Sequence, residues 1–164
     1  MRGRGAVSCV FPCYFFAIQL ESHLMSISYS HPWFPGGHII VYMTKTPQFI
    51  EGVESFQNGQ QGTLGRYPFH FHLCGSLAGN GMVFKNNAIR NSFQRCLSVH
   101  STHDAVIESN VAYNSSGHCF FIEDGGEHGN LFLNNLGMVT NPGEGTSTVV
   151  CTVWVLVYSQ SLLW

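Results

Sequence analysis

Two consecutive stretches of the chain repeat each other without a gap, and this repeat constrains the fold more than any other feature. They are FKNNAIRNSFQRCLSVH, residues 84–100, and IESNVAYNSSGHCFFIE, residues 107–123, and they are offset by 23 positions. The identical pairs are Asn87 and Asn110, Asn91 and Asn114, Ser92 and Ser115, and Cys96 and Cys119. Several other aligned pairs are apolar in both copies, among them Phe84 with Ile107 and Val99 with Ile122. A short repeat with the same apolar positions is typical of a solenoid, in which each copy stacks on the next.

The repeats carry the pattern of short strands. A weaker third copy, residues 50–59, aligns when one residue is deleted, and a fourth lies at residues 131–139. Each copy has short alternating apolar runs broken by Gly, Asn and Ser, without a helical period long enough to stand alone. We therefore predict an all-β fold, a parallel β-helix, in which equivalent Asn side chains stack as hydrogen-bonded ladders. An antiparallel sandwich is the alternative, but it does not require identical turn residues at a fixed period.

Composition supports a solenoid and restricts the partners. Charged residues make up 10% of the chain, against about 25% in a typical soluble domain. The net charge of −2, without a basic run, gives no support for nucleic-acid binding. Four or five coils without a visible polar cap indicate a fragment of a longer β-helix.

The cysteines and a glycosylation sequon each allow two interpretations. Cys96 and Cys119 occupy equivalent positions of neighbouring coils, so they either form a disulfide or remain small buried thiols. Asn114 begins the sequon Asn-Ser-Ser, and a glycan at Asn114 competes with its place in an Asn column.

Both ends differ from the middle, so we divide the chain into residues 1–34, 35–143 and 144–164. The first segment starts with two arginines and an apolar run, which fits either a signal peptide or an artificial start inside a longer reading frame. The last segment is almost free of charge and apolar. It is read as a spurious extension, an edge strand or a membrane anchor, although a spanning helix needs about 20 apolar residues.

Extending the repeat upstream places ionisable side chains on one outer ridge. If Phe71 stacks on Val99 and Ile122, then His72, His100 and Glu123 share one outward column. A second outward column contains His70, Ser98 and Phe121, and beyond the strands follow His103, Asp104, Asp124, Glu127 and His128. This ridge is the candidate functional surface.

Three interpretations of the ridge stay open. It is a solvated face on which His and carboxylates pair, a metal site, or a catalytic or glycan-binding groove. For a metal, His72, His100 and Glu123 suit zinc or another first-row transition metal, whereas added Asp124 and Glu127 oxygens suit calcium better. For glycoside cleavage, which needs a proton donor and a second carboxylate, the residues are Glu123 or Asp124 with Asp104, assisted by His100 or His72.

Three stretches carry a resemblance to a known family: GQQGTLGRYPFHFHLCG, SFQRCLSVHSTHD and NSSGHCFFIEDGGEHGN. They resemble the β-helix region of the cell-migration-inducing and cell-surface hyaluronidases and of the fibrocystin-like receptors, over residues 35–143. The resemblance implies a right-handed parallel β-helix from a large secreted or membrane-tethered extracellular protein. In the hyaluronidase branch it also implies hyaluronan binding and calcium-aided depolymerisation, whereas the fibrocystin-like branch is receptor-like. The loop after Cys74 is short and lacks the acidic insert of the hyaluronidases.

The function hypothesis is therefore an extracellular module that binds, and in the enzyme branch cleaves, an anionic polysaccharide such as hyaluronan. The candidate catalytic residues are Asp104, Glu123, Asp124 and His100, and the candidate substrate-binding residues are His70, His72, Arg66 and Glu127. Calcium is the expected cofactor. The alternatives are a noncatalytic receptor or adhesion ectodomain and the product of a decayed gene.

Overall fold

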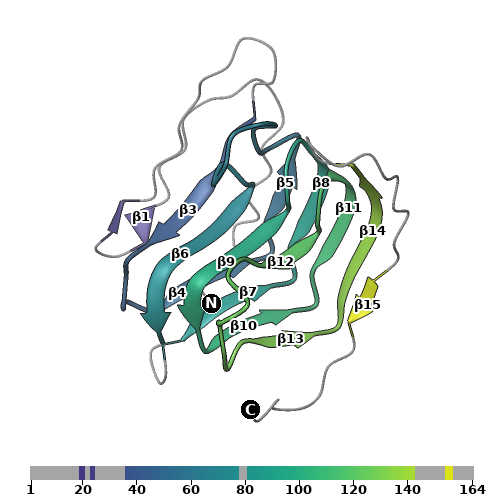
Figure 1. Cartoon of the computed structure of the whole chain (residues 1–164). Helices are drawn as coiled ribbons and strands as arrows, with labels where there is room; N and C mark the ends of the chain where they lie inside the picture. Colours follow the sequence, from purple (N-terminus) through teal and green to yellow (C-terminus); the bar gives the residue numbers. More distant parts are fainter. Residues whose placement is uncertain (1–18, 21–22, 25–35, 78–80, 143–153, 157–164) are drawn as a thin grey trace, which may run out of the picture.

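The strands wind into stacked coils, each of which contributes one strand to each of three sheets (Figure 1). The structure is a computed structural model that describes residues 36–77 and 81–142, together with the backbone of three short strands. These are β1 (Gln19–Leu20), β2 (His23–Leu24) and β15 (Trp154–Leu156). Within this part of the chain every sheet is built of parallel strands, apart from the short pair β1–β2 and the edge strand β15. The fold is thus the predicted parallel β-helix, and not a sandwich.

The three sheets run side by side along the stack. The first contains β3 (Ile39–Tyr42), β6 (Phe69–Ser76), β9 (Leu97–His103) and β12 (Phe120–Ile122). The second contains β4 (Gln48–Glu51), β7 (Met82–Lys85), β10 (Ala105–Glu108) and β13 (Leu131–Leu133). The third contains β5 (Glu54–Phe56), β8 (Ala88–Ser92), β11 (Val111–Ser116), β14 (Asn135–Asn141) and β15.

The register confirms the repeat and corrects one detail of it. Phe84 pairs with Ile107, as the ungapped alignment predicts. In the preceding coil Ile50 pairs with Phe84 and Glu54 with Ala88, an offset of 34 residues in both cases. The deletion proposed for the third copy was therefore wrong. It seemed necessary because Val53 stands where the later coils have Asn, which hides the match.

The apolar core fills the space between the three sheets. It includes Phe69, Phe71 and Val99 from the first sheet, Phe84 and Ile107 from the second, and Ile89 and Ala112 from the third, all fully buried. The rings of Phe69 and Phe84 pack edge to face with centroids 4.8 Å apart. Burial of a large apolar side chain contributes about 1.5–3 kcal/mol, so these aligned columns stabilise the stack coil by coil.

A buried ladder of Asn side chains runs along the turns between the second and third sheets. Asn110 donates to the Phe84 carbonyl (2.9 Å), and its Oδ1 accepts from the Asn87 amide (3.0 Å). Asn87 and Asn135 make the equivalent bonds in their own coils. The predicted ladder is confirmed, and it satisfies turn groups that would otherwise be buried without partners.

A second Asn ladder lies on the third sheet. Asn114 donates to Asn91 and accepts from Asn141, at 2.8 Å in both bonds. Asn114, the sequon residue, is only half-buried there. Cys96 and Cys119 are both free and buried, so the second alternative for this pair holds and they form no disulfide.

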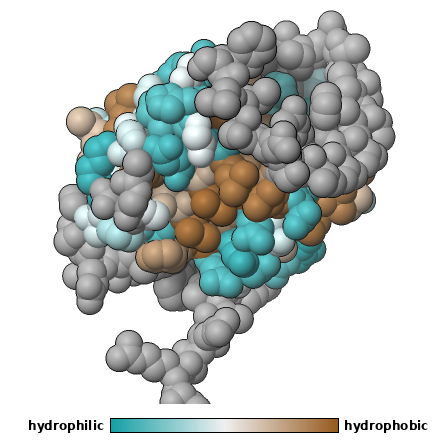
Figure 2. Space-filling view, turned by 90° about the horizontal axis from the view of Figure 1, so that it is seen from below, coloured by the Kyte–Doolittle hydropathy of each residue, from teal (hydrophilic) through white to brown (hydrophobic). Residues whose placement is uncertain are grey.

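The outer face of the second sheet carries an apolar band, and Figure 2 views the molecule from that side. Phe49, Val83, Val106 and Leu131 pair in register along it, and Phe49 is 59% exposed. In the described part of the chain there is no helix long and apolar enough to cross a membrane. The interpretations given for residues 1–34 and 144–164 lie outside the fully described residues.

Candidate functional site

The candidate site lies on the outer face of the first sheet. His72 pairs with His100 in neighbouring coils, and the Glu123 amide donates to the Val99 carbonyl (2.9 Å), which extends the same ladder by one coil. The pairing keeps its register as far as His72 and shifts only beyond it, so His72, His100 and Glu123 lie in one column, as the sequence predicted. Strands in such a sheet lie about 4.8 Å apart, so the three side chains are close enough to interact.

A loop, residues 57–68, covers part of this face and buries His70. The sequence predicted His70 in an outward column, and it does face the pocket on the outer side, but it is only 2% exposed. Its Nδ1 lies 3.1 Å from the Gly65 carbonyl oxygen, and the Tyr67 ring packs edge-on against it at 4.9 Å. The sequence did not predict this burial, because the covering loop has no periodic pattern that would place it.

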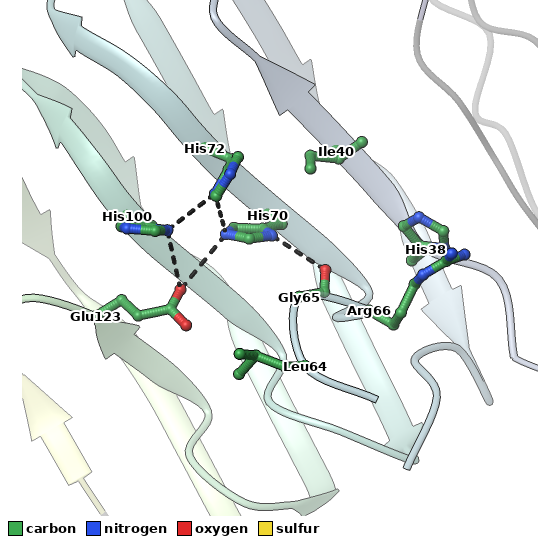
Figure 3. Close-up of a pocket in the computed structure, with 9 residues that line it drawn as sticks. All are labelled: His38, Ile40, Leu64, Gly65, Arg66, His70, His72, His100 and Glu123. Carbon is green, nitrogen blue, oxygen red and sulfur yellow. Dashed lines mark hydrogen bonds and ion pairs between the residues drawn. The ribbon is translucent and has the colours of Figure 1, made fainter. Parts of the chain in front are cut away.

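Three imidazoles meet beneath this loop (Figure 3). His72 Nδ1 lies 3.2 Å from His70 Nε2 and 2.9 Å from His100 Nδ1. Burial lowers the pKa of His70 to about 4. The pKa of His72 is lowered as well, first by burial and then by the neighbouring His100. His70 is therefore uncharged at neutral pH, and the cluster carries less positive charge than three protonated histidines would.

Glu123 points at this cluster and is held from several sides. Tyr67 donates its hydroxyl to Oε1 (2.9 Å), and Ser98 donates to Oε2 (3.1 Å). Oε2 lies 3.5 Å from His70 Nε2 and 3.8 Å from His100 Nδ1. Burial and the bond to Glu123 raise the pKa of Tyr67, so this hydroxyl stays a donor. The carboxylate is thus fixed in one orientation beside the imidazoles.

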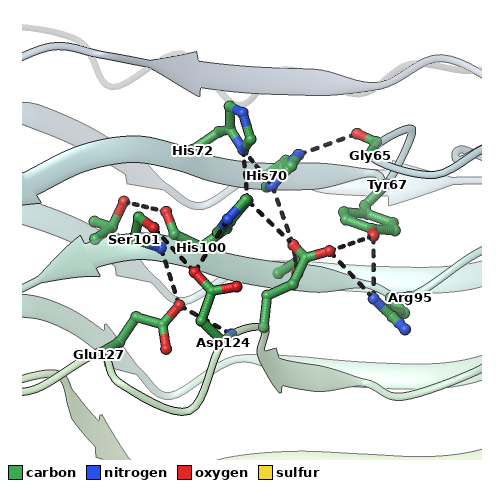
Figure 4. A network of polar contacts seen from close by, with 12 residues as sticks. Gly65, Tyr67, His70, His72, Arg95, His100, Ser101, Asp124 and Glu127 are labelled. Carbon is green, nitrogen blue, oxygen red and sulfur yellow. Dashed lines mark hydrogen bonds and ion pairs between the residues drawn. The ribbon is translucent and has the colours of Figure 1, made fainter.

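Arg95 closes the network on the side away from the histidines. It donates to the Tyr67 hydroxyl (3.0 Å), lies 3.5 Å from Glu123 Oε1 and stacks over the Phe121 ring at 4.0 Å. Figure 4 shows Tyr67 and Arg95 next to each other at this end of the network. The guanidinium compensates the carboxylate charge and orients the tyrosine.

Two of the other three predicted carboxylates, Asp124 and Glu127, lie in the next turn and support the site (Figure 4). Asp124 lies 3.1 Å from His100 Nε2 and accepts a bond from the Ser101 hydroxyl (2.9 Å). Glu127 accepts from the backbone amides of Ser101 (2.9 Å) and Asp124 (3.2 Å). Asp124 thus reaches the histidine cluster directly, whereas Glu127 fixes the turn that carries Asp124.

Asp104 is not brought to this site. It follows the end of β9, where it accepts a bond from the Ser76 hydroxyl (2.6 Å) and lies against Gly129. His103 and His128 stack on each other nearby, with ring centroids 4.0 Å apart. The structure therefore separates Asp104 from Glu123, its predicted catalytic partner.

The histidine cluster opens into a pocket of about 500 Å³ (Figure 3). It is lined by His38, Ile40, Leu64, Gly65, Arg66, His70, His72, His100 and Glu123. Arg66 and His38 form the wall opposite the cluster. Sequence analysis missed His38, Tyr67 and Arg95, because none of them belongs to a repeated column. The only signal for them is that each lies just before a strand of the first sheet, β3, β6 or β9.

The donor atoms of this pocket do not fit calcium. Calcium takes six to eight oxygen ligands, whereas imidazole nitrogens suit zinc, copper, nickel or iron. His70, His72 and His100 each offer a nitrogen, and these atoms lie within 4.8 Å of one another. The expected calcium ion stays a prediction that this pocket does not support.

The sequence of this chain is similar to those of a known class of proteins with a β-helix. Residues 34–159 match the CEMIP β-helix family, and the chain belongs to this family. Two kinds of relatives share its sequence. The human protein named cell surface hyaluronidase CEMIP2 is 42% identical over 113 residues, and the mouse cell migration-inducing and hyaluronan-binding protein is 41% identical over 113 residues. Mouse fibrocystin-L is 47% identical over 89 residues.

These matches cover 66%, 66% and 54% of this chain. They cover 8%, 8% and 2% of the three relatives, so the chain corresponds to a small part of each. The predicted membership of the hyaluronidase and fibrocystin-like family is confirmed.

Proposed function

We propose that this chain is part of an extracellular or cell-surface β-helix module that binds and depolymerises an anionic polysaccharide such as hyaluronan. The observation that carries the proposal is the open pocket in which Glu123 and three imidazoles converge opposite Arg66. The names of the hyaluronan-related relatives supply the candidate polymer.

The walls of the pocket suit a sugar chain with carboxylate groups. Arg66 offers a planar cation, which pairs well with carboxylates. Tyr42 stacks on His72 with centroids 5.5 Å apart and is 52% exposed, so it extends the pocket with an aromatic surface. An aromatic side chain of this kind offers contact area together with a polar tip.

The cleavage chemistry rests on two carboxylates that flank one imidazole. Glu123 Oε2 lies 3.8 Å from His100 Nδ1, and Asp124 Oδ2 lies 3.1 Å from Nε2 of the same ring. Glycoside cleavage commonly uses two carboxyl groups, one as proton donor and one as base or nucleophile. In our proposal Glu123 and Asp124 are these two carboxyl groups, and His100 lies between them. Asp104 is replaced by Asp124 in this pair, since it lies elsewhere.

The test uses the full chain with hyaluronan of high molar mass. We expect light scattering after size separation to show shortened polymer, at a rate reduced about 100-fold or more by Glu123→Gln. Arg66→Ala should weaken binding. Glu51→Gln is the matched control, because Glu51 is exposed on the second sheet and bonds Asn86 outside the pocket. Cleavage that survives Glu123→Gln would remove this residue from the mechanism.

The second candidate is a noncatalytic receptor or adhesion module. The observation that favours it is the match to fibrocystin-L, which is higher in identity than the matches to the hyaluronan-related relatives quoted above. For a receptor, hyaluronan or another polyanion would bind to the chain without any shortened product. That outcome, with binding lost in Arg66→Ala, would replace the enzyme by the receptor.

A further inference from the structure

Three imidazole nitrogens of the first sheet face one common point. We propose that His70 Nε2, His72 Nδ1 and His100 Nδ1 bind a divalent first-row transition metal ion such as Zn²⁺, with Glu123 beside the fourth coordination position. This inference does not depend on the polysaccharide function, because it concerns the ion alone. The argument rests on the distances between the nitrogens and on what holds the far side of each ring.

Two of the three distances between the nitrogens are close to those of a zinc site. Ligand atoms placed about 2.0–2.1 Å from a tetrahedral zinc ion lie about 3.3 Å from one another. His72 Nδ1 is 3.2 Å from His70 Nε2 and 2.9 Å from His100 Nδ1. All three donor atoms lie within 4.8 Å of one another. His70 is buried, so the partly exposed rings of His72 and His100 would move to bring the set to the ideal spacing.

The outer nitrogens fix two of the rings in the tautomer that a metal requires. His70 Nδ1 lies 3.1 Å from the Gly65 carbonyl oxygen, which can only accept, so this nitrogen carries a proton. His100 Nε2 lies 3.1 Å from the Asp124 carboxylate and is protonated for the same reason. In the neutral rings the inner nitrogens of His70 and His100 then present lone pairs. Carbonyl and carboxylate partners of this kind are characteristic of metal-binding histidines.

Without an ion, the inner nitrogens are poorly matched. His72 Nδ1 has only one proton to offer, yet it faces two lone pairs, those of His70 and His100. One shared proton cannot make two good linear hydrogen bonds. A cation at this point would satisfy all three nitrogens at once.

Glu123 defines the remaining side of the site. Its Oε2 lies 3.5 Å from His70 Nε2 and 3.8 Å from His100 Nδ1, so it borders the fourth position. Tyr67 and Ser98 hold the carboxylate in place. Three protein ligands and one open position characterise catalytic zinc sites, in which the ion acts as a Lewis acid. The ion would also add positive charge to a pocket that faces a polyanion.

The direct test is titration of the chelator-stripped full chain with Zn²⁺ alone, followed by calorimetry. We expect one ion per chain, and Co²⁺ in its place should give the visible absorption of a nitrogen-ligated, low-symmetry site. The double variant His72→Ala/His100→Ala should lose affinity at least about 100-fold. His128→Ala is the matched control, since His128 is exposed and outside the pocket, and it should bind like the original chain.

Two measurements keep the result interpretable. Circular dichroism of each variant checks the fold, and both rings replaced in the double variant are only partly buried, so the fold should persist. Asp124→Asn retains all three ligands and should weaken Zn²⁺ binding about 10-fold, as loss of an outer partner does. The proposal is overturned if the original chain does not bind Zn²⁺ or if the folded double variant binds it equally well.

The outcomes also separate the metal from the polysaccharide function. A chain that binds Zn²⁺ at this site but leaves hyaluronan intact and unbound would refute the proposed function and leave the metal site standing. A chain that cleaves hyaluronan but binds no Zn²⁺ would refute the metal site and leave the proposed function standing.

Discussion

The side chain of Asn110 makes several buried hydrogen bonds that an apolar side chain could not replace. Its amide nitrogen donates to the Phe84 carbonyl and to Asn135 Oδ1, while its own Oδ1 accepts from the Asn87 amide. These bonds link three consecutive coils through a fully buried side chain. A buried polar group left without a partner costs more free energy than a hydrogen bond contributes. The ladder therefore favours the native register in addition to stabilising the fold.

The substitution Asn110→Ala tests this ladder. It leaves the Asn87 amide and the Phe84 carbonyl without their side-chain partner, so we expect a loss of about 3 kcal/mol in the free energy of unfolding. Urea denaturation followed by circular dichroism measures it. Asn141→Ala is the control at the exposed end of the second ladder, where water can replace the lost bonds, and should cost about 1 kcal/mol or less. Equal losses in the two variants would contradict the argument.

Some residues could be placed from the sequence and others could not. The Asn ladder and the column of His72, His100 and Glu123 were predicted because register repeats along a solenoid, so one aligned pair fixes its neighbours. The burial of His70 was not predicted, since it depends on Tyr67 and Gly65 in a loop that occurs only once. The periodic pattern of the sequence predicts the strands but not the loop that covers them.

At the scale of elements, the loop of residues 57–68 decides whether the outer face is a flat sheet or a pocket. Gly59 and Gln60 tie its start to the N-terminal end of the first coil: the Gly59 amide donates to the Gly37 carbonyl (2.7 Å), and the Gln60 side chain donates to the Gly36 carbonyl (3.0 Å). Its end provides Arg66 for the pocket wall and Tyr67 for Glu123. The loop therefore couples the first strand of the stack to the histidine cluster.

Gly59→Ala should displace this loop. Gly59 has φ +85°, and an added Cβ would lie 2.9 Å from Pro68 Cδ and 3.0 Å from Gln94 Cβ. Gly52→Ala is the matched control, with φ +70° and nothing within 4 Å of the added atom. Both variants suffer the left-handed strain of about 1–2 kcal/mol, but only Gly59→Ala should also weaken the hyaluronan binding proposed above. Thermal unfolding and binding assays measure the two effects, and unchanged binding in Gly59→Ala would show that the loop does not shape the pocket.

At the scale of the whole molecule, the fold is one kind of coil that repeats through three sheets. The sequence predicted the parallel β-helix because two stretches 23 residues apart have the same apolar positions, and the three parallel sheets confirm it. It could not predict the separation of Asp104 from Glu123. That separation depends on the turn after β9, where Asp104 accepts a bond from the Ser76 hydroxyl instead of facing the pocket. The stacking of strands determines which side chains are neighbours in adjacent coils. The turns determine which side chains meet at the ends of the strands.

The three proposed ligands come from two consecutive coils, and this predicts an effect on the stability of the chain. His70 and His72 belong to β6 and His100 to β9, while Glu123 beside the site follows β12. In a solenoid each coil contacts only its neighbours, so an ion that joins two coils opposes their separation. An ion that binds only the folded state adds about 2.7 kcal/mol to the free energy of unfolding when its free concentration is 100 times its Kd.

We therefore expect Zn²⁺ at that concentration to raise the unfolding free energy of the original chain by about 2.7 kcal/mol, and EDTA to reverse the gain. Urea denaturation with and without the ion measures the difference. His128→Ala should show the same gain, because its side chain is exposed outside the pocket. His72→Ala/His100→Ala should show almost none, since it lacks two of the three nitrogens that would hold the coils together. A similar gain in the double variant would place the stabilising ion elsewhere on the chain.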